Sequence, residues 1–338
     1  MSQTDPKAPA QSVSVYRADQ LRVVNGANMG DGLGFAEELE LDDVFNLSPV
    51  AALHRLSLVP ASRPPFSVAV DSGIGTPGAA LHLDCCLTFM SGNGETTEAL
   101  VLVETDAEGG VVQVLVLPVA PMQPRRDYVL VGIDRAGALQ TFAQMACTSF
   151  TAGTMITLAS GAQRAVEDLR EGDRVLTRDD GPQEIRWIGH NTTRAIGAFA
   201  PVLIRAGTLN NARDLRVSPD HRLFVYQRQD RLGAGRAELL VRARHLVNGT
   251  TITRTEGGFV DYYQMLFDRH QIVYAEGIAA ESLLVDTRTR AALPGDLDKT
   301  MGALLPDHGR SDQGVFEVQE TLLRRPDAAE ALRKSSRC

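Results

Sequence analysis

The chain has 338 residues, of which 43% are apolar and 22% charged, and it carries a net charge of −8. This length allows two domains, and the composition excludes a disordered chain as the default. The basic residues, nearly all arginines, are interleaved with acidic ones, so the charge pattern gives only weak support to nucleic-acid binding. No apolar run approaches the roughly 20 residues of a membrane-spanning helix.

The first 12 residues are polar and predict a disordered lead-in. From residue 13 to about 145, short β-type segments alternate with turns rich in Gly, Asp and Pro, a spacing that suits an antiparallel sandwich or barrel. We expect a β-sandwich-like domain, in which the apolar run Val111–Pro118 is a central strand buried on both faces. Residues 35–47 predict a short helix or a loop. The expected strands are residues 12–16, 21–24, 55–59, 66–70, 81–90, 99–104, 110–119 and 128–134.

A change in charge marks a domain boundary near residue 146. Residues 1–146 hold 17 of the 42 acidic residues but only 8 of the 34 basic ones, whereas the remainder of the chain is nearly neutral. We therefore divide the chain into a lead-in at 1–12, a β-rich domain of unknown role at 13–146 and a second domain at 147–286. A linker and tail follow at 287–338.

The second domain also predicts short strands joined as hairpins, and the tail predicts short helices at 315–325 and 328–334. The domain as a whole is expected to be all-β. Its expected strands are residues 155–158, 174–177, 184–189, 215–217, 222–227, 237–241, 249–253, 260–267, 271–275 and 282–285.

The start of the chain and its cysteines bear on the cellular compartment. The first six residues lack the basic start and apolar stretch of a conventional signal peptide. Cys85, Cys86, Cys147 and Cys338 show neither metal-ligand spacing nor a disulfide framework. The default expectation is a cytoplasmic protein, and secretion without an N-terminal signal stays open.

Two candidate nucleophiles, Cys147 and Ser149, lie where the chain enters the second domain. A hydroxyl or thiol at such a junction can attack the carbonyl just upstream and exchange an amide for an ester or thioester. Cysteine ionises more readily near neutral pH, whereas serine needs an adjacent base. Taken alone, both residues could equally be small residues of a linker.

The segment from Ser218 to His221 follows the predicted strand 215–217 and reads Ser-Pro-Asp-His. A hydroxyl and an imidazole three positions apart at a strand end can both face one peptide bond. The histidine would protonate the departing backbone nitrogen while the hydroxyl holds the carbonyl or the amide. The alternative is a turn histidine that is hydrogen-bonded to a neighbouring carboxylate.

Two further histidines follow in the same domain. His270, between a turn and the strand 271–275, could reach the site as a second polar group, or it could be a half-buried residue at a strand end. His245 is expected to pack beside a loop. Zinc sites usually include one close ligand pair, whereas His221, His245 and His270 are 24 and 25 residues apart, so no metal is predicted.

Together these motifs resemble the Hedgehog/intein (Hint) superfamily, in its bacterial branch of Hint-domain proteins. The family's opening nucleophile followed by Gly-Thr is matched at 149–154, its Gly-Asp-x-Val turn at 172–175, and its Thr-x-x-His motif at 218–221 with serine replacing threonine. A late histidine before a short strand and a glycine is matched by His270 and Gly277. The resemblance implies an all-β horseshoe domain with Ser149, or alternatively Cys147, as nucleophile and Ser218, His221 and His270 at the site.

The sequence also departs from the family pattern. Most relatives carry cysteine where Ser149 stands, and inteins end on an asparagine that is absent from residues 279–283. The resemblance therefore implies N-terminal self-cleavage by an N-to-O (or N-to-S) acyl shift, without splicing and without a cofactor. The substrate would be the chain's own N-terminal domain, the external acyl acceptor is unknown, and no nucleic acid or membrane takes part.

Two other functions stay open at this point. A Hint-like domain without chemistry would leave a scaffold for a binding or secreted interaction module. The N-terminal domain could also bind carbohydrate, an idea that rests on fold analogy alone.

Overall fold

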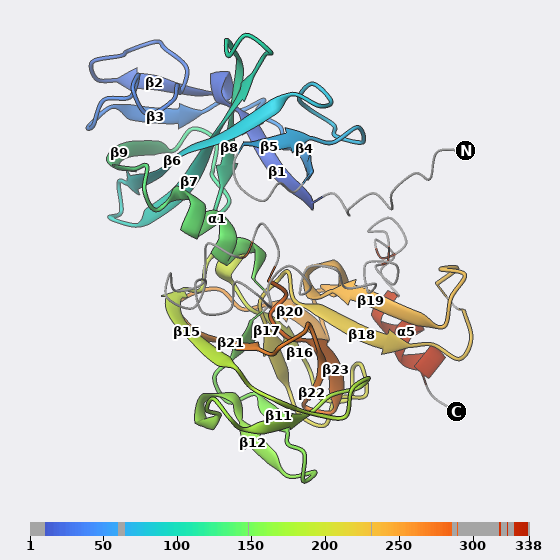
Figure 1. Cartoon of the computed structure of the whole chain (residues 1–338). Coiled ribbons are helices and arrows are strands. Elements are labelled where there is room, and N and C mark those ends of the chain that lie inside the picture. The colour runs from blue at the N-terminus through green and yellow to red at the C-terminus, as the bar shows by residue number, and fades with distance from the viewer. Residues whose placement is uncertain are drawn as a thin grey trace, which may run out of the picture. The chain divides into compact units, whose positions relative to one another are not determined.

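The structure is a computed structural model that describes residues 11–59, 65–147, 149–230, 232–285, 289, 318, 323 and 328–336 (Figure 1). The chain divides between Gln144 and Met145 into two compact units. The predicted lead-in falls on residues 1–10, which lie outside the described part, and on residues 11 and 12, which belong to the first strand. Among the described residues no helix has the length and apolar character needed to cross a membrane.

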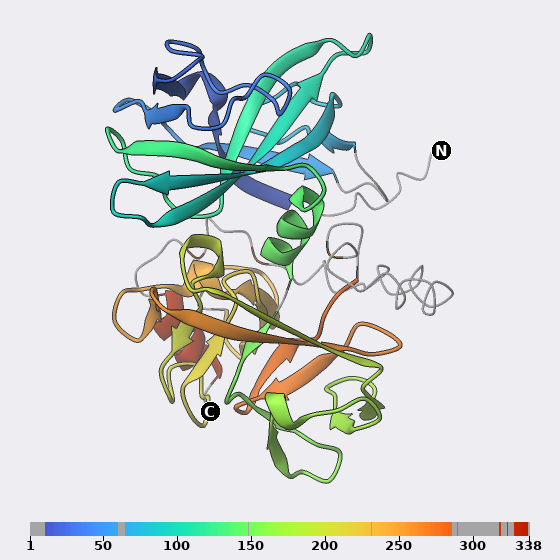
Figure 2. The ribbon, with the colours of Figure 1, turned by 90° about the vertical axis from the view of Figure 1, so that its left-hand side faces the viewer.

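Nine antiparallel strands form the sheet of the first unit in its described residues, 11–59 and 65–144. They are β1 (Gln11–Arg17), β2 (Leu21–Asn25), β3 (Val44–Leu47), β4 (His54–Val59), β5 (Phe66–Val68), β6 (Ala80–Ser91), β7 (Thr96–Thr105), β8 (Val111–Pro118) and β9 (Asp127–Asp134). Their pairing closes a ring, because β6 pairs with β5 near its start and with β7 along its length, and β4, β1 and β8 complete the circle. The sheet is therefore barrel-like, and its ribbons curl around a shared interior (Figure 2). Pairing in a ring leaves fewer unpaired strand edges than an open sandwich would.

Three details of this unit differ from the expectation. The strand β8 is central in the sheet, but Val111 and Val112 are each 52% exposed, so only its second half is buried on both faces. Residues 35–43 form a loop with turns at 36–38 and 41–42, as one of the two alternatives expected, whereas the strand β3 at 44–47 was not predicted. The helix α1 (Ala138–Ala146) was not predicted, although Ala138 and Phe142 are spaced one turn apart and both are buried.

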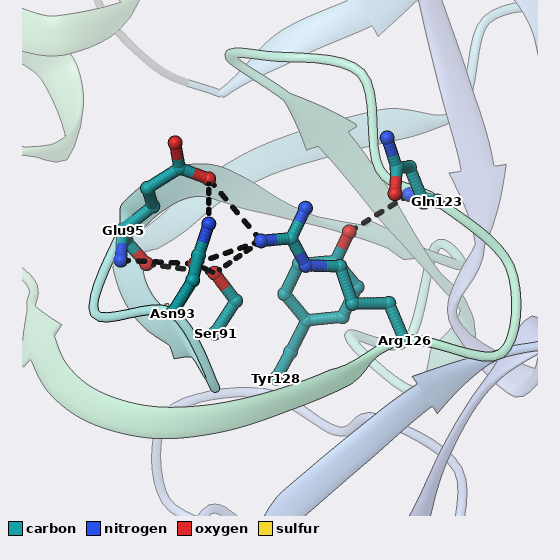
Figure 3. Close-up of polar contacts among 6 residues, drawn as sticks. All are labelled: Ser91, Asn93, Glu95, Gln123, Arg126 and Tyr128. Atoms are coloured by element: carbon teal, nitrogen blue, oxygen red, sulfur yellow. Dashed lines mark hydrogen bonds and ion pairs between the residues drawn. The ribbon is translucent and has the colours of Figure 1, made fainter.

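One polar network ties two loops of this unit together (Figure 3). Arg126 donates to the Ser91 hydroxyl at 3.0 Å, to the Asn93 side-chain oxygen at 2.8 Å and to Glu95 at 3.2 Å. Asn93 also donates to Glu95 at 2.6 Å. The turn between β6 and β7 is thus held by a hydrogen bond within it and by those from Arg126. These groups satisfy one another, and the network accounts for the conformation of the turn.

The described residues of the second unit contain two six-stranded antiparallel sheets and a two-stranded hairpin. The first sheet has the order β15 (Trp187–Arg194), β21 (Phe259–Leu266), β10 (Phe150–Thr151), β17 (Leu215–Val217), β16 (Val202–Ile204) and β20 (Ile252–Arg254). The second has β12 (Gln163–Ala165), β11 (Met155–Thr157), β22 (Ile272–Ala275), β23 (Ile278–Glu281), β18 (Arg222–Tyr226) and β19 (Glu238–Arg242), and β13 (Arg174–Leu176) pairs with β14 (Pro182–Glu184). Buried Val, Ile and Leu side chains from both sheets form one core.

The mainly β fold and the short helix near the C-terminus are confirmed. The helix α5 (Ala328–Ser336) packs on this core through Ala328, Ala329 and Leu332 and lies near β18 (Figure 1). The helix expected at 315–325 and the linker after 286 lie outside the described residues, apart from Thr289, Val318 and Leu323. The strand expected at 282–285 was wrong, because β23 ends at Glu281 and residues 282–285 are not in a strand.

The hairpin between β22 and β23 holds the start of the domain in place. Glu276 has φ 49° and Gly277 has φ 81°, the left-handed pair that a two-residue hairpin of this type requires. The buried Glu276 carboxylate accepts the Met155 amide hydrogen at 2.8 Å and an Arg213 N–H at 3.1 Å. One carboxylate thus links β11, the hairpin and the loop before β17.

Candidate functional site

Ser149 precedes the short strand β10, which lies between β17 and β21. Its backbone meets Ser218 at the end of β17: the Ser149 amide donates to the Ser218 hydroxyl at 3.0 Å, and the Ser218 amide donates to the Ser149 carbonyl at 2.9 Å. The Ser218 hydroxyl in turn donates to the Cys147 carbonyl at 3.1 Å. Ser149 is 3% exposed and Ser218 is buried, so these hydrogen bonds are shielded from water.

His221 reaches the same backbone segment from the turn that follows β17. Its Nδ1 atom lies 3.1 Å from the Ser149 carbonyl oxygen. Because a carbonyl only accepts, this contact places the hydrogen of the neutral ring on Nδ1. The ring is fully buried and packs edge-on against Phe150, with 4.4 Å between ring centroids. The predicted meeting of a hydroxyl and an imidazole around Ser149 is therefore present in the structure.

Burial controls the charge of His221. It lowers the pKa of the ring to about 4, and the cation of the neighbouring Arg222 acts in the same direction. Hydrogen bonds to the backbone of Ser149 and Glu281 oppose this change only in part. The imidazole is therefore neutral at pH 7, and it acts there as a hydrogen-bond donor through Nδ1.

The expected roles of Ser218 and His221 need one refinement. The group in direct contact with the Ser149 nitrogen is Ser218, whereas the described contact of His221 is with the Ser149 carbonyl. In an extended chain the N–H and C=O of one residue point to the same side. The Nδ1 atom of His221 therefore lies on the same side of the chain as the N–H group of Ser149.

Gln264 is a site residue that the sequence did not reveal. Its Nε2 donates to the Ser149 hydroxyl oxygen at 3.1 Å. The register of β10 against β21 pairs Phe150 with Tyr263, so the next pair along is Ser149 with Gln264. Among the described residues, the side chain that hydrogen-bonds to this hydroxyl is the amide of Gln264, which is not ionisable. A polar residue in the otherwise apolar run 262–267 was the available signal.

Cys147 lies in a different environment from Ser149. Its side chain is buried in a small apolar cluster with Leu266, Leu283 and Val285, and Trp187 packs against that cluster. Its backbone carbonyl contacts the site, as the acceptor of the Ser218 hydroxyl. The peptide bond before Ser149 involves Thr148, which lies outside the described residues.

His270 is brought into a buried ion-pair cluster. Its Nε2 lies 3.5 Å from one oxygen of Glu281, and Arg222 donates to the other oxygen at 2.5 Å. The cluster borders His221 through the neighbouring Arg222 and the backbone of Glu281, both of which act on the pKa of that ring.

His245 contacts its neighbour Arg244, which donates to its Nε2 at 2.9 Å. His221, His245 and His270 do not converge, and the described residues contain no group of three or more His, Cys, Asp or Glu side chains able to hold a metal ion.

Comparison with known proteins identifies the second unit. Residues 148–287 match the family model of the Hint domain. A stretch of 86 residues is 31% identical to the V-type proton ATPase catalytic subunit of Candida tropicalis; it covers 24% of this chain and only 8% of that protein's length. Two solved structures are similar over about two-fifths of the chain. The Ssp DnaB mini-intein variant M86 has 14% identity and a TM-score of 0.28, covering 41% of this chain and 97% of its own. The gp41-1 intein has 10% identity and a TM-score of 0.25, covering 39% and 97%.

The family match spans the opening serine, the Gly-Asp turn, the Ser218–His221 turn and the late histidine that the sequence singled out. The chain is a Hint-domain protein, and its Hint domain occupies residues 148–287.

Proposed function

We propose that this protein cleaves its own backbone between Thr148 and Ser149 by an N-to-O acyl shift, and so releases its N-terminal domain. The observation that carries the proposal is the hydrogen bond from the Ser149 amide, which is the leaving nitrogen, to the Ser218 hydroxyl at 3.0 Å. A buried residue with its hydroxyl beside its own amide, and with an imidazole on the same edge, suits attack on the preceding carbonyl.

The reaction balances without a cofactor. The Ser149 hydroxyl oxygen forms a bond to the carbonyl carbon of Thr148, and the bond between that carbon and the Ser149 nitrogen breaks. The proton of the hydroxyl ends on the freed amine, and the product is an ester. Water then hydrolyses the ester, which leaves a carboxylate on Thr148 and restores the Ser149 hydroxyl.

Each polar neighbour has a role in this scheme. Ser218 orients the leaving nitrogen, because its hydroxyl oxygen accepts the hydrogen of that amide. His221 supplies a proton from the same side, best in its protonated form. Gln264 fixes the orientation of the attacking hydroxyl. His270 acts one residue further away, through the Glu281–Arg222 pair that borders His221.

Cleavage without splicing follows from the end of the domain. The region after β23 begins with Ser282 and contains no asparagine that could cyclise and release the C-terminal flank. The substrate of the proposed reaction is therefore the chain's own N-terminal domain. Cys147 is the weaker nucleophile candidate, since its side chain packs in an apolar cluster.

A second candidate function is a Hint scaffold without chemistry that serves as a binding module. The observation in its favour is the surroundings of the Ser149 hydroxyl, whose described neighbour is an amide donor and not a base. At a pKa of about 4, roughly one His221 ring in a thousand is protonated at pH 7, which also makes the acid scarce.

The test is incubation of the purified full chain at pH 5 to 8, with and without hydroxylamine, followed by intact-mass spectrometry. Self-cleavage predicts a fragment of residues 1–148, obtained as a hydroxamate when hydroxylamine traps the ester, and a faster reaction as the pH falls. Ser149→Ala should abolish the fragment. An intact chain after days under all these conditions would instead support the scaffold.

A further inference from the structure

Asp220 lies between Ser218 and His221, and the cleavage scheme assigns it no role. Its carboxylate accepts hydrogen bonds from two arginines of the neighbouring element: one oxygen accepts from Arg242 at 3.0 Å and the other from Arg244 at 3.1 Å. All three side chains are largely buried. Asp220 thus anchors the turn that carries Ser218 and His221 to these two arginines.

Backbone hydrogen bonds attach the same turn to the same neighbour. Arg242 ends β19, and the 3-10 helix η4 (Ala243–Leu246) follows it. The Ala243 amide donates to the His221 carbonyl at 2.9 Å, and the Arg244 amide donates to the Pro219 carbonyl at 2.9 Å. Within the turn, the His221 amide donates to the Ser218 carbonyl at 3.0 Å. Asp220 therefore adds a charged contact to a turn that backbone hydrogen bonds already attach to η4.

The electrostatics make this contact strong. The cations of Arg244 and Arg242 hold the pKa of the Asp220 carboxyl below its usual range, although burial acts in the opposite direction. Hydrogen bonds between ionised partners are about twice as strong as neutral ones. Loss of the carboxylate would remove both side-chain contacts that join this turn to Arg242 and Arg244, and so weaken its attachment to η4.

We propose that Asp220 is a positioning residue for the Ser149 site: with Arg242 and Arg244 it fixes the turn so that the Ser218 hydroxyl and the His221 ring reach Ser149 together. The effect on reaction rate rests on the self-cleavage proposed above. The effect on geometry does not, because the hydrogen bond between the Ser149 amide and the Ser218 hydroxyl exists whether or not the chain cleaves.

Asp173 offers a matched control in the same domain. It accepts from the Arg164 side chain at 2.7 Å and from the Arg170 amide at 2.8 Å, and it closes the turn 170–173. Like Asp220 it is a turn carboxylate between two arginines, both of which lower its pKa. It makes no described contact with Ser149, Ser218 or His221. A general loss of stability should therefore affect Asp173→Asn as much as Asp220→Asn.

The first experiment measures geometry in full-length chains that carry Ser149→Ala, which cannot cleave. Amide hydrogen exchange is followed by NMR at residue 149, whose N–H bonds to Ser218, in Asp220→Asn and in Asp173→Asn. We expect exchange at 149 to accelerate at least tenfold in Asp220→Asn and to stay unchanged in Asp173→Asn. Unchanged exchange in Asp220→Asn, or equal acceleration in both variants, overturns the proposal.

The second experiment measures cleavage in chains that retain Ser149. Asp220→Asn should slow cleavage at least tenfold more than Asp173→Asn does at an equal change in Tm, and Asp220→Glu should recover part of the rate. If the parent chain cleaves and Asp220→Asn matches its rate, the positioning role is wrong. If the parent chain never cleaves while exchange at 149 still responds to Asp220→Asn, self-cleavage fails and the positioning role stands.

Discussion

The hydroxyl of Ser218 accepts the amide hydrogen of Ser149 at 3.0 Å, across 69 positions of the sequence. The same hydroxyl donates to the Cys147 carbonyl at 3.1 Å, so one side chain holds the backbone on both sides of Thr148. In the proposed reaction this bridge would hold the leaving nitrogen of Ser149 in place.

Replacement of Ser218 tests the bridge directly. Ser218→Ala leaves the buried Ser149 amide without its acceptor, which should lower the free energy of unfolding by about 1–3 kcal/mol. Cleavage should slow at least tenfold, and Ser218→Thr should retain most of the rate because it keeps the hydroxyl. Urea unfolding and fragment mass spectrometry measure the two effects. Ser160→Ala, in an exposed turn, is the control, and a parent-like rate in Ser218→Ala would contradict the role.

Gln264 can be converted from a donor into a base. Gln264→Leu removes the hydrogen bond to the Ser149 hydroxyl and should slow cleavage several-fold. Gln264→Glu places a carboxylate where it can accept the hydroxyl hydrogen, and we expect a rate increase of about tenfold above pH 5. The measurement is the first-order rate of fragment formation against pH. Equal rates in the Leu and Glu variants would rule out a role for this contact.

The identity of the nucleophile can be read from a pair of cysteine variants. Ser149→Cys introduces a group that ionises more readily, so cleavage should accelerate and become sensitive to added thiols. Cys147→Ala should leave the cleavage rate unchanged and lower the free energy of unfolding by about 1–2 kcal/mol, because its side chain packs in a buried apolar cluster. Cleavage that disappears in Cys147→Ala would instead identify the sulfur as the attacking group.

The lowered pKa of His221 predicts how stability depends on pH. The ring has a pKa of about 4 in the folded protein and the usual 6.5 when unfolded, so the unfolded chain binds the extra proton first. Stability is therefore unaffected by this residue above pH 7 and falls as the pH drops from about 6.5 to 4, by up to about 3 kcal/mol.

The check is urea unfolding of the parent chain and His221→Gln between pH 4.5 and 7.5. Contributions of the carboxylates occur in both proteins, so the difference between the two curves isolates the imidazole. The difference should shift in favour of the variant as the pH falls. A difference that is constant across this range would show that His221 titrates normally in the folded chain.

Local sequence patterns predicted most strands but few contacts. The segments 128–134 and 215–217 are short runs rich in apolar residues between turn signals, and they match β9 and β17 closely. The helix α1 was missed, because its apolar residues show only a weak helical spacing and lie next to the domain boundary inferred from the change in charge. The strand β3 was missed because its four residues follow an acidic turn region and gain stability only by pairing with β2 and β9.

The residues of the candidate site also divide into those that local patterns predicted and those that only the fold brings together. The spacing of Ser149 before Gly153-Thr154 and the Ser218–His221 pair are local patterns, and they pointed to the Hint domain. Gln264 lies 115 positions from Ser149, and the two arginines that hold Asp220 lie at the end of β19 and in η4. Such partners follow from strand register, which a single sequence does not specify over these separations.

The sequence by itself determined that this is a mainly β protein with a Hint domain, because turn chemistry, alternating apolar residues and short motifs act over a few neighbouring positions. Only the tertiary structure decided that Ser218 contacts the leaving nitrogen, that His221 is buried and neutral, that Cys147 packs among apolar side chains and that His270 joins an ion pair. The reason is physical: those properties depend on which distant strands pair and on what excludes water from each group, and both are set by the folded chain as a whole.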